Sequence, residues 1–380
     1  MVPAVLRLAV VTTLAPGLLA AAEPGPHVAP TRPVAAATMP ASPGRGALAS
    51  LAGTRVSGIE FVSVRDVAGV LGLNPAWSEP GRRLVLSDAT TRVEVTAGSR
   101  EIGVNGLRLF LGSPIVLRSG ALYLSRSDFE RSLAPRLRPA LLGRPLARPR
   151  VIALDPGHGG SDHGMENKTL KLQEKVLTLE VALRLKSLLE ARGYTVVLTR
   201  PDDRQLGPDK PTDFLRRALI VNSAKADLLV SIHFNSLYPD TKTSGTETYT
   251  FTPAFQRSTR AWSPGESDDV ERDAAPVNRF DPWSALLAQS MQREVLASLK
   301  TVDRGQKTAH WAILRGLNCP AVLVESVFLS NDVEARRAST PAYLHQIAGA
   351  LADGIGAYAD SLEKLQPKPV APPAVNPPSP

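Results

Sequence analysis

Two histidines and two glutamates in the second half of the chain stand where buried strands end or a helix begins. His158 follows one apolar run within a Gly-rich turn, His233 ends a second run, and Glu325 ends a third. Glu174 stands at the start of a helical pattern, where the helix dipole favours an acid. In an open α/β sheet the carboxyl ends of the strands converge on the ligand crevice. A His/Glu/His set with an open fourth position suits a catalytic zinc ion.

These four positions also have ordinary structural explanations. A histidine at a strand end usually makes only a hydrogen bond, and an acid at a helix start usually caps the helix. The single cysteine, Cys319, excludes a thiolate zinc site, and we expect it to be a small buried hydrophobe. The chain also lacks the His-Glu-x-x-His helix of the common zinc proteases. The residues alone therefore leave both a metal site and a structural role open.

The pattern from 150 to 364 predicts alternating strands and helices. Strands are expected at the short apolar runs 151–155, 194–198, 227–232, 245–251 and 320–325. Helices are expected at the longer amphipathic patterns 174–192, 215–224, 283–299 and 343–358. Apolar strands without clean alternation indicate a sheet that is buried on both faces. We therefore expect an α/β domain whose mostly parallel or mixed sheet is covered by helices on both faces.

Six motifs follow one another along the same segment. They are Leu154–Gly160, Glu174–Lys175, Val197–Arg200, Ser231–Asn235, Arg304–Lys307 and Val322–Asn331. Together they resemble the catalytic domain of zinc-dependent N-acetylmuramoyl-L-alanine amidases, the type 3 amidase family of bacterial cell-wall hydrolases. The resemblance runs from about 150 to 360, over more than half of the chain.

The resemblance implies one Zn²⁺ ion held by His158, Glu174 and His233. It puts the family's catalytic glutamate at Glu325, which would take a proton from water and return one to the leaving nitrogen. The implied reaction is hydrolysis of the amide between N-acetylmuramic acid and the L-alanine of the peptidoglycan stem peptide. Asn235 and Arg304, which lie within two of the motifs, are predicted to bind the substrate.

Some residues depart from the family pattern. Val327 stands where a glycine is usual, a packing change that should leave the Glu325 carboxylate in place. We expect His163 and Glu166, in a less typical stretch, to lie at the surface. Two other functions stay open: a zinc peptidase that cuts elsewhere in the stem peptide, and a non-catalytic wall-binding protein with a vestigial metal site. Product analysis on peptidoglycan separates them, since only an amidase frees the intact peptide from the glycan.

The segment 54–135 predicts a small α+β domain of short strands and Gly-containing turns. Its stretches 61–68, 103–106 and 121–126 resemble the copper amine oxidase N-terminal-like module of many exported bacterial wall proteins. The resemblance implies no oxidase activity, and the segment has no visible set of metal ligands. A wall-binding or positioning role and a plain spacer are both open.

The ends of the chain are predicted to lie outside the folded units. Residues 1–22 have the apolar run and small-residue pattern of an export signal, with a short buried helix or an uncleaved anchor as alternatives. The Pro-rich linker 23–53 and tail 365–380 are expected to be disordered, and 136–149 to be a basic linker. We expect the mature protein in the periplasm or cell envelope, without a stable membrane anchor.

The net charge and composition of the chain indicate which classes of binding partner to expect. The net charge of +8 favours anionic partners such as a cell wall. We expect no nucleic-acid partner, because only 5% of the residues are aromatic and they are not interleaved with basic ones. The arginines of 131–150 are either solvated or in contact with anionic wall polymer. In the long polar loop 252–280, the acidic stretch 264–275 is either solvated or a lid over the zinc that an activator protein lifts.

Overall fold

The computed structural model describes residues 51–259 and 273–367, and the account below concerns these residues. The predicted export signal at 1–22 and nearly all of the linker 23–53 lie outside them. Most of the acidic stretch 264–275 and almost the whole C-terminal tail also lie outside them. The expectations for those segments therefore stay predictions.

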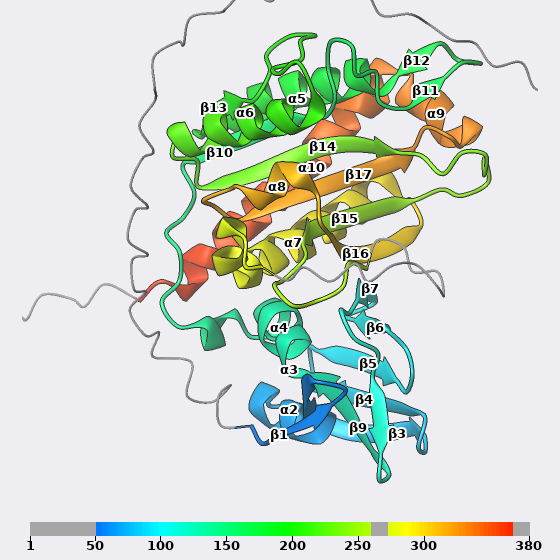
Figure 1. The fold of residues 1–380 in the computed structure, drawn as a ribbon, viewed down its shortest axis with the longest axis vertical. Helices are drawn as coiled ribbons and strands as arrows, with labels where there is room; N and C mark the ends of the chain where they lie inside the picture. Colours follow the sequence, from blue (N-terminus) through cyan, green and yellow to red (C-terminus); the bar gives the residue numbers. More distant parts are fainter. Residues whose placement is uncertain (1–50, 260–272, 368–380) are drawn as a thin grey trace, which may run out of the picture. The chain divides into compact units, whose positions relative to one another are not determined.

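An α/β unit built around one mixed sheet occupies the second half of the chain (Figure 1). Its strands are β10 (Val151–Pro156), β13 (Thr195–Leu198), β14 (Leu228–Asn235), β15 (Thr246–Phe251), β16 (Asp303–Ala309) and β17 (Ala321–Phe328), and a short hairpin of β11 (Glu166–Asn167) and β12 (Leu172–Gln173) lies outside this sheet. The order is β13-β10-β14-β17-β15-β16. The first four strands are parallel, β15 runs antiparallel to β17, and β16 runs parallel to β15. The predicted mixed α/β sheet is confirmed.

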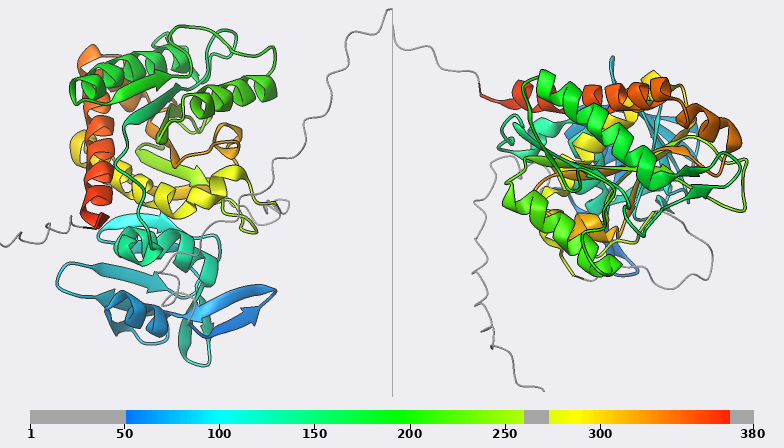
Figure 2. Two further views of the ribbon diagram at one scale, coloured as in Figure 1. Left: turned by 90° about the vertical axis from the view of Figure 1, so that its left-hand side faces the viewer. Right: turned by 90° about the horizontal axis from the view of Figure 1, so that it is seen from above.

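Helices cover both faces of this sheet. They are α5 (Glu174–Ala191), α6 (Lys210–Ser223), α7 (Asp281–Leu299), α8 (Ala312–Arg315), α9 (Asp332–Ala338) and α10 (Pro341–Leu365), with the 3-10 turn η3 (Pro276–Phe280) before α7. Successive strand residues point to opposite faces. Ile152 and Leu154 of β10 accordingly share one core with α5, α7 and α10, while Ala153 packs on the other face with α6 and α8. Figure 2 shows helices on both sides of the strands, as the sequence predicts.

Two helices are longer than their apolar periodicity predicts. Helix α6 begins at Lys210 rather than near 215, because the Asp209 side chain accepts a hydrogen bond from the Thr212 backbone N–H and caps it. Helix α10 runs to Leu365, well past the predicted end at 358. Among the helices of the described residues, none has both the length and the apolar character needed to cross a membrane.

The N-terminal module forms a small, strand-rich α+β unit with its own core. Its strands are β1 (Gly53–Val56), β2 (Ile59–Ser63), β3 (Asn74–Glu79), β4 (Arg83–Ser87), β5 (Arg92–Thr96), β6 (Glu101–Val104), β7 (Leu107–Phe110), β8 (Val116–Arg118) and β9 (Ala121–Ser125). Its helical segments are α2 (Val64–Leu71), α3 (Arg126–Asp128), η1 (Phe129–Leu133), α4 (Ala134–Leu137) and η2 (Pro139–Leu142). Strands β1, β2, β9 and β8 form one sheet, and β3 to β7 form an antiparallel meander.

The meander and the mixed sheet of the second half of the chain are continuous. Strand β7 pairs in parallel with β16, with Leu109 opposite Gln306, so that one eleven-stranded sheet runs through both units. The helical turn α4 also contacts α7. The module is therefore bonded to β16, the edge strand of the mixed sheet in the second half of the chain.

Several arginines of the predicted basic linker bind acceptors of the chain itself. The Arg136 Nε donates to Gln306 Oε1 at 2.8 Å, and an Arg148 guanidinium nitrogen donates to Asp360 Oδ1 at 3.0 Å. An Arg138 nitrogen likewise donates to Asp88 Oδ2 at 2.6 Å. The segment is thus helical in part, and these three arginines have acceptors within the chain.

Candidate metal centre

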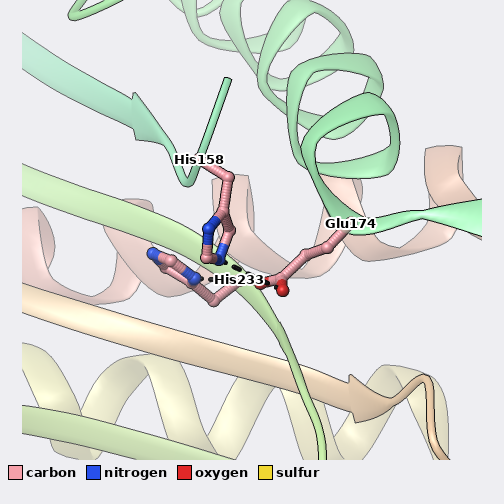
Figure 3. A group of neighbouring side chains, drawn as sticks. All are labelled: His158, Glu174 and His233. Carbon is pink, nitrogen blue, oxygen red and sulfur yellow. Dashed lines mark hydrogen bonds and ion pairs between the residues drawn. The ribbon is translucent and has the colours of Figure 1, made fainter. Parts of the chain in front are cut away.

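His158, Glu174 and His233 meet in one cluster although they come from three different elements (Figure 3). His158 follows β10, Glu174 is the first residue of α5, and His233 lies near the end of β14. The His158 Nε2 lies 3.1 Å from Glu174 Oε2, and the His233 Nδ1 lies 3.0 Å from Glu174 Oε1. One ligand atom from each of the three residues lies within 4.8 Å of the others. The structure therefore brings together the three residues that the sequence proposed as a set.

Glycines make room for this cluster. A Cβ atom on Gly157 would lie 2.3 Å from the Cε1 of His233, so no larger residue fits there. Gly164 has a φ of +66°, and a Cβ on it would lie 2.5 Å from Glu174 Oε2. His158 itself has a φ of 62°, a conformation that is unusual for a residue with a side chain. Backbone strain of this kind is typical of functional sites, where the surrounding structure enforces it.

The ligand candidates are held by further hydrogen bonds. The Nδ1 of His158 lies 3.0 Å from Asp162 Oδ2, which leaves the Nε2 directed at Glu174. The Glu174 carboxylate accepts bonds from the backbone N–H groups of Met165 at 2.8 Å and Phe234 at 3.1 Å. Such outer partners fix the orientation of metal-binding histidines and carboxylates.

The charges in the cluster are coupled. Burial opposes the ionised form of Glu174, but the hydrogen bonds from His158 and His233 outweigh it and hold the pKa of this carboxyl well below its usual range. Burial also opposes the charged form of His158, yet the bond to Glu174 and its charge raise the pKa of that imidazole. The buried carboxylate and the two imidazoles therefore form a cluster that favours a positive charge between them.

The donor set fits zinc. Ligand atoms on a tetrahedral zinc, at bonds of about 2.0–2.2 Å, stand about 3.3–3.6 Å apart, and two imidazoles plus one carboxylate match catalytic zinc sites. The two closest donor pairs here, at 3.1 and 3.0 Å, need to open only slightly to admit the ion.

A buried ion pair underlies the His158 turn. Asp155, the penultimate residue of β10, is 1% exposed and accepts a bond from an Arg217 nitrogen at 2.9 Å. Burial alone would raise the pKa of Asp155, but the Arg217 charge and neighbouring hydrogen bonds lower it below its usual value. Arg217 also donates to the His158 carbonyl at 2.6 Å, and Arg200 donates to the Gly157 carbonyl at 2.8 Å. The two guanidinium groups therefore fix the backbone of the turn.

Glu325 lines the same pocket as the cluster. The pocket has a volume of about 410 Å³, within the range of small-molecule sites, and His158, Glu174 and His233 also line it. In the β14–β17 register His233 stands opposite Glu325, so both side chains emerge on the same face of the sheet. The structure thus places a second carboxyl beside the candidate metal ligands, as the strand ends predicted.

An apolar wall completes this pocket. Phe214, Tyr249 and Trp311 line it, and the rings of Tyr249 and Trp311 meet edge to face with centroids 5.8 Å apart. The pocket is therefore polar on the metal side and aromatic on the α6–α8 side.

The two residues predicted to bind substrate have different settings. Asn235 lines the pocket, and its Nδ2 donates to Glu247 Oε2 at 2.9 Å. Arg304 is not among the lining residues; its Nε donates to Glu247 Oε1 at 2.9 Å, and its guanidinium lies 5.1 Å from the Phe328 ring centroid. The structure therefore connects both residues to one carboxylate that the sequence reasoning did not single out.

Glu247 is that missed residue. It is 3% exposed, and its carboxylate accepts hydrogen bonds from Asn235 Nδ2, Tyr249 Oη, Arg304 Nε and Lys307 Nζ at 2.9, 2.6, 2.9 and 2.7 Å. A signal was present in the sequence. A glutamate within a predicted buried strand needs a cation, and the Arg304–Lys307 motif offers two.

His163 and Glu166 lie apart from the ligand group. Their side chains contact each other, and the His163 side chain is 44% exposed. They do not belong to the metal-binding group found among the described residues. This placement agrees with the surface position expected for them.

Two sequence families match the chain. A profile described as N-acetylmuramoyl-L-alanine amidase matches residues 152–357, and one described as the copper amine oxidase N-terminal domain matches residues 54–136.

Individual relatives agree with the first of these families. The chain is 30% identical over 218 residues to the germination-specific N-acetylmuramoyl-L-alanine amidase of Bacillus subtilis, covering 55% of this chain and 79% of that protein. It is 30% identical over 255 residues to the N-acetylmuramoyl-L-alanine amidase AmiC of Escherichia coli, covering 62% of this chain but only 59% of that protein. The crystal structure of an N-acetylmuramoyl-L-alanine amidase from Clostridium difficile 630 aligns with 57% of this chain and 99% of its own, at 30% identity and a TM-score of 0.46.

Proposed function

Because the chain belongs to the N-acetylmuramoyl-L-alanine amidase family, we propose that it hydrolyses the amide between N-acetylmuramic acid and L-alanine with a zinc ion held by His158, Glu174 and His233. The observation that carries this proposal is the convergence of those three donors in one pocket, with Glu325 on the neighbouring strand. The match over 152–357 covers more than half of the chain.

Zinc is the proposed cofactor because the donors are two imidazoles and one carboxylate around an open side. When bound, the ion supplies a Lewis acid that polarises the amide carbonyl and lowers the pKa of a water molecule. The chain contributes the geometry: Asp162 orients His158, and two backbone N–H groups orient Glu174.

Glu325 is the proposed proton carrier. Its carboxylate takes a proton from the attacking water and delivers one to the alanine nitrogen as the amide breaks. The pocket supports this role because Glu325 is only 8% exposed there, beside His233 in the register of the two strands. A carboxyl group kept from bulk water transfers its proton to the reacting atoms rather than to solvent.

The aromatic wall suits the substrate around the scissile bond. The lactyl group and the alanine side chain each carry a methyl group, and Phe214 and Trp311 offer apolar surface for them. Asn235 is fixed by its bond to Glu247 and by the Ser236 N–H, which donates to Asn235 Oδ1 at 2.8 Å. We propose that this held amide contacts the polar backbone of the stem peptide.

We also propose export to the periplasm or cell envelope, because the proposed substrate, peptidoglycan, lies outside the cytoplasm. An activator protein that acts on the loop 252–280 is a further proposal. It rests on the acidic composition of 264–275.

Digestion of purified peptidoglycan tests the proposal. The protein with one equivalent of zinc should release intact stem peptides, identified by mass, and a chelator should stop the release until zinc is restored. Fragments cut within the peptide would indicate a zinc peptidase. Binding to peptidoglycan without release of any fragment would indicate a wall-binding protein.

A further inference from the structure

We propose that the N-terminal module helps to position side chains of the pocket. Its Phe110 positions Lys307, and Lys307 in turn positions the Glu247 carboxylate. That carboxylate holds Asn235 and Tyr249 in the pocket. This inference rests on the proposed amidase activity of that pocket. It gives the module a positioning role in the pocket. This role differs from the binding of cell wall and from the role of a plain spacer.

The module makes specific bonds to the strand that carries Lys307. The backbone N–H of Arg108 donates to Asp303 Oδ2 at 2.8 Å, and an Arg108 guanidinium nitrogen donates to the Asp303 carbonyl at 3.1 Å. Leu109 pairs with Gln306, which is fully buried and also accepts from Arg136 of the module. Strand β16 is therefore fixed by backbone and side-chain bonds at successive positions.

Phe110 lies directly against the same strand. A Cβ on Gly305 would lie 2.5 Å from the Phe110 Cε2, so the glycine leaves a space that the ring fills. The Lys307 Nζ lies 5.4 Å from the Phe110 ring centroid, a distance at which a cation is attracted to the ring face. The module thus supplies one wall of the Lys307 site.

Lys307 transmits this contact to Glu247. It is 9% exposed, and its ammonium group donates to Glu247 Oε1 at 2.7 Å. The other carboxylate oxygen of Glu247 accepts from Asn235 and Tyr249, which both line the pocket. The position of the ammonium group therefore decides where this carboxylate, and with it two pocket-lining side chains, can lie.

Glu247 also stands next to the proposed proton carrier. In the antiparallel β15–β17 pair Glu247 is opposite Glu325, and such partners have Cβ atoms about 5 Å apart on the same face. Like charges at that separation repel each other unless cations are near, and Lys307 and Arg304 are those cations. Holding Lys307 in place therefore matters for the reaction as well as for packing.

Removing the Phe110 ring would let water reach Lys307. A solvated ammonium group holds a carboxylate less firmly than a buried one, because the surrounding dielectric constant rises. Glu247, Asn235 and Tyr249 would then sample several positions. Loose positioning lowers the rate of the chemical step while the zinc ligands stay intact.

Three variants of the full-length zinc protein test this inference. Phe110→Ala should lower kcat about tenfold, with KM within about twofold and one zinc per chain retained. Phe110→Tyr keeps the ring face and should restore kcat. Trp77→Ala removes a partly buried aromatic residue from β3, at the far edge of the same sheet, and should leave kcat unchanged below its melting temperature.

A double-mutant cycle adds the mechanism. Lys307→Met should lower kcat at least as much as Phe110→Ala, and the double variant should be no slower than Lys307→Met, because both act through the same ammonium group. Additive losses, a Phe110→Ala enzyme with wild-type kcat, or equal losses in Trp77→Ala would each overturn the inference. Failure of the proposed function is distinguishable, since the unmodified protein would then release no stem peptide at all.

Discussion

Two buried carboxylates have similar surroundings but different partners: Glu174, which lines the pocket, and Glu247, which bonds to the pocket-lining Asn235 and Tyr249. Glu174 lies between His158 and His233, and Glu247 lies between Arg304 and Lys307. Both are almost fully buried, and both have a pKa below the usual value because their cationic partners outweigh the cost of burial.

The difference is whether the partners can give up their charge. Imidazoles lose a proton near neutral pH and then present a lone pair to a metal ion. Lysine and arginine keep their protons and have no lone pair to offer. The same arrangement of a carboxylate between two basic groups is therefore suited to hold a metal ion at Glu174 and to fix side-chain positions at Glu247.

The largest expected effect is on the metal side. His233→Ala should lose zinc and fall to background activity, because two donors do not hold the ion against water. Metal content by elemental analysis and release of stem peptide would measure this. The matched control is His163→Ala, which replaces a partly exposed histidine that contacts Glu166. This variant should keep both its zinc and its release of stem peptide. A His233→Ala protein with one tightly bound zinc would contradict the ligand assignment.

The next effect separates proton transfer from metal binding. Glu325→Gln should lower kcat by about 10²–10⁴-fold, because the amide cannot accept the water proton, while zinc stays bound. Stopped assays on a soluble muropeptide would measure the loss of kcat, and zinc analysis of the same protein would show that the metal is still bound. Retention of most of the rate would remove Glu325 from the mechanism.

A smaller effect is expected on the positioning side. Glu247→Gln keeps the shape but removes the charge that binds Lys307 and Arg304, so kcat should fall about tenfold with zinc retained. Glu180→Gln, which removes a surface partner of Arg184 on α5, is the control and should have wild-type kinetics. Loss of zinc from the Glu247→Gln protein would show that the two clusters are not separate.

The smallest effect is a change in the acid stability of the protein. The folded-state pKa of Glu247 lies below its usual 4.5, because Lys307 attracts the carboxylate more than burial disfavours it. Its contribution to stability is therefore present above the unfolded pKa and is lost as the pH falls through the folded pKa. In the presence of a chelator, the melting temperature of the wild type should exceed that of Glu247→Gln at about pH 6, and the gap should shrink towards about pH 3. A gap that does not depend on pH would mean that this charge adds nothing to folding.

Much of the catalytic fold could be predicted because burial leaves a clear pattern. The runs 151–155, 227–232 and 320–325 are short and apolar, so their strand character and their shared sheet edge follow from composition and the α/β rules. The same rules made the grouping of His158, Glu174 and His233 plausible, and the resemblance to the amidase family singled out these three as a ligand set. The start of α6 at Lys210 was missed, because a polar cap and not apolar periodicity defines it.

Glu247 and the docking of the module could not be predicted in the same way. Strand β16 is Asp303–Ala309, a polar sequence in which Gln306 and Lys307 are buried and bonded to other parts of the chain. No local period marks such a strand, since its partners lie far away in sequence, as Leu109 and Gln306 do. The role expected for Arg304 depended on a motif alone, and only the three-dimensional contact with Glu247 gives it a partner.

The pairing of β7 with β16 also affects the tendency of the protein to aggregate at high local concentration. An uncovered edge strand presents a row of free backbone groups on which other chains can assemble. The module occupies that position on β16, where Leu109 lies opposite Gln306. We expect the segment 150–364, produced alone, to self-associate through β16. By covering the edge of β16, the module would thus protect the enzyme from aggregation.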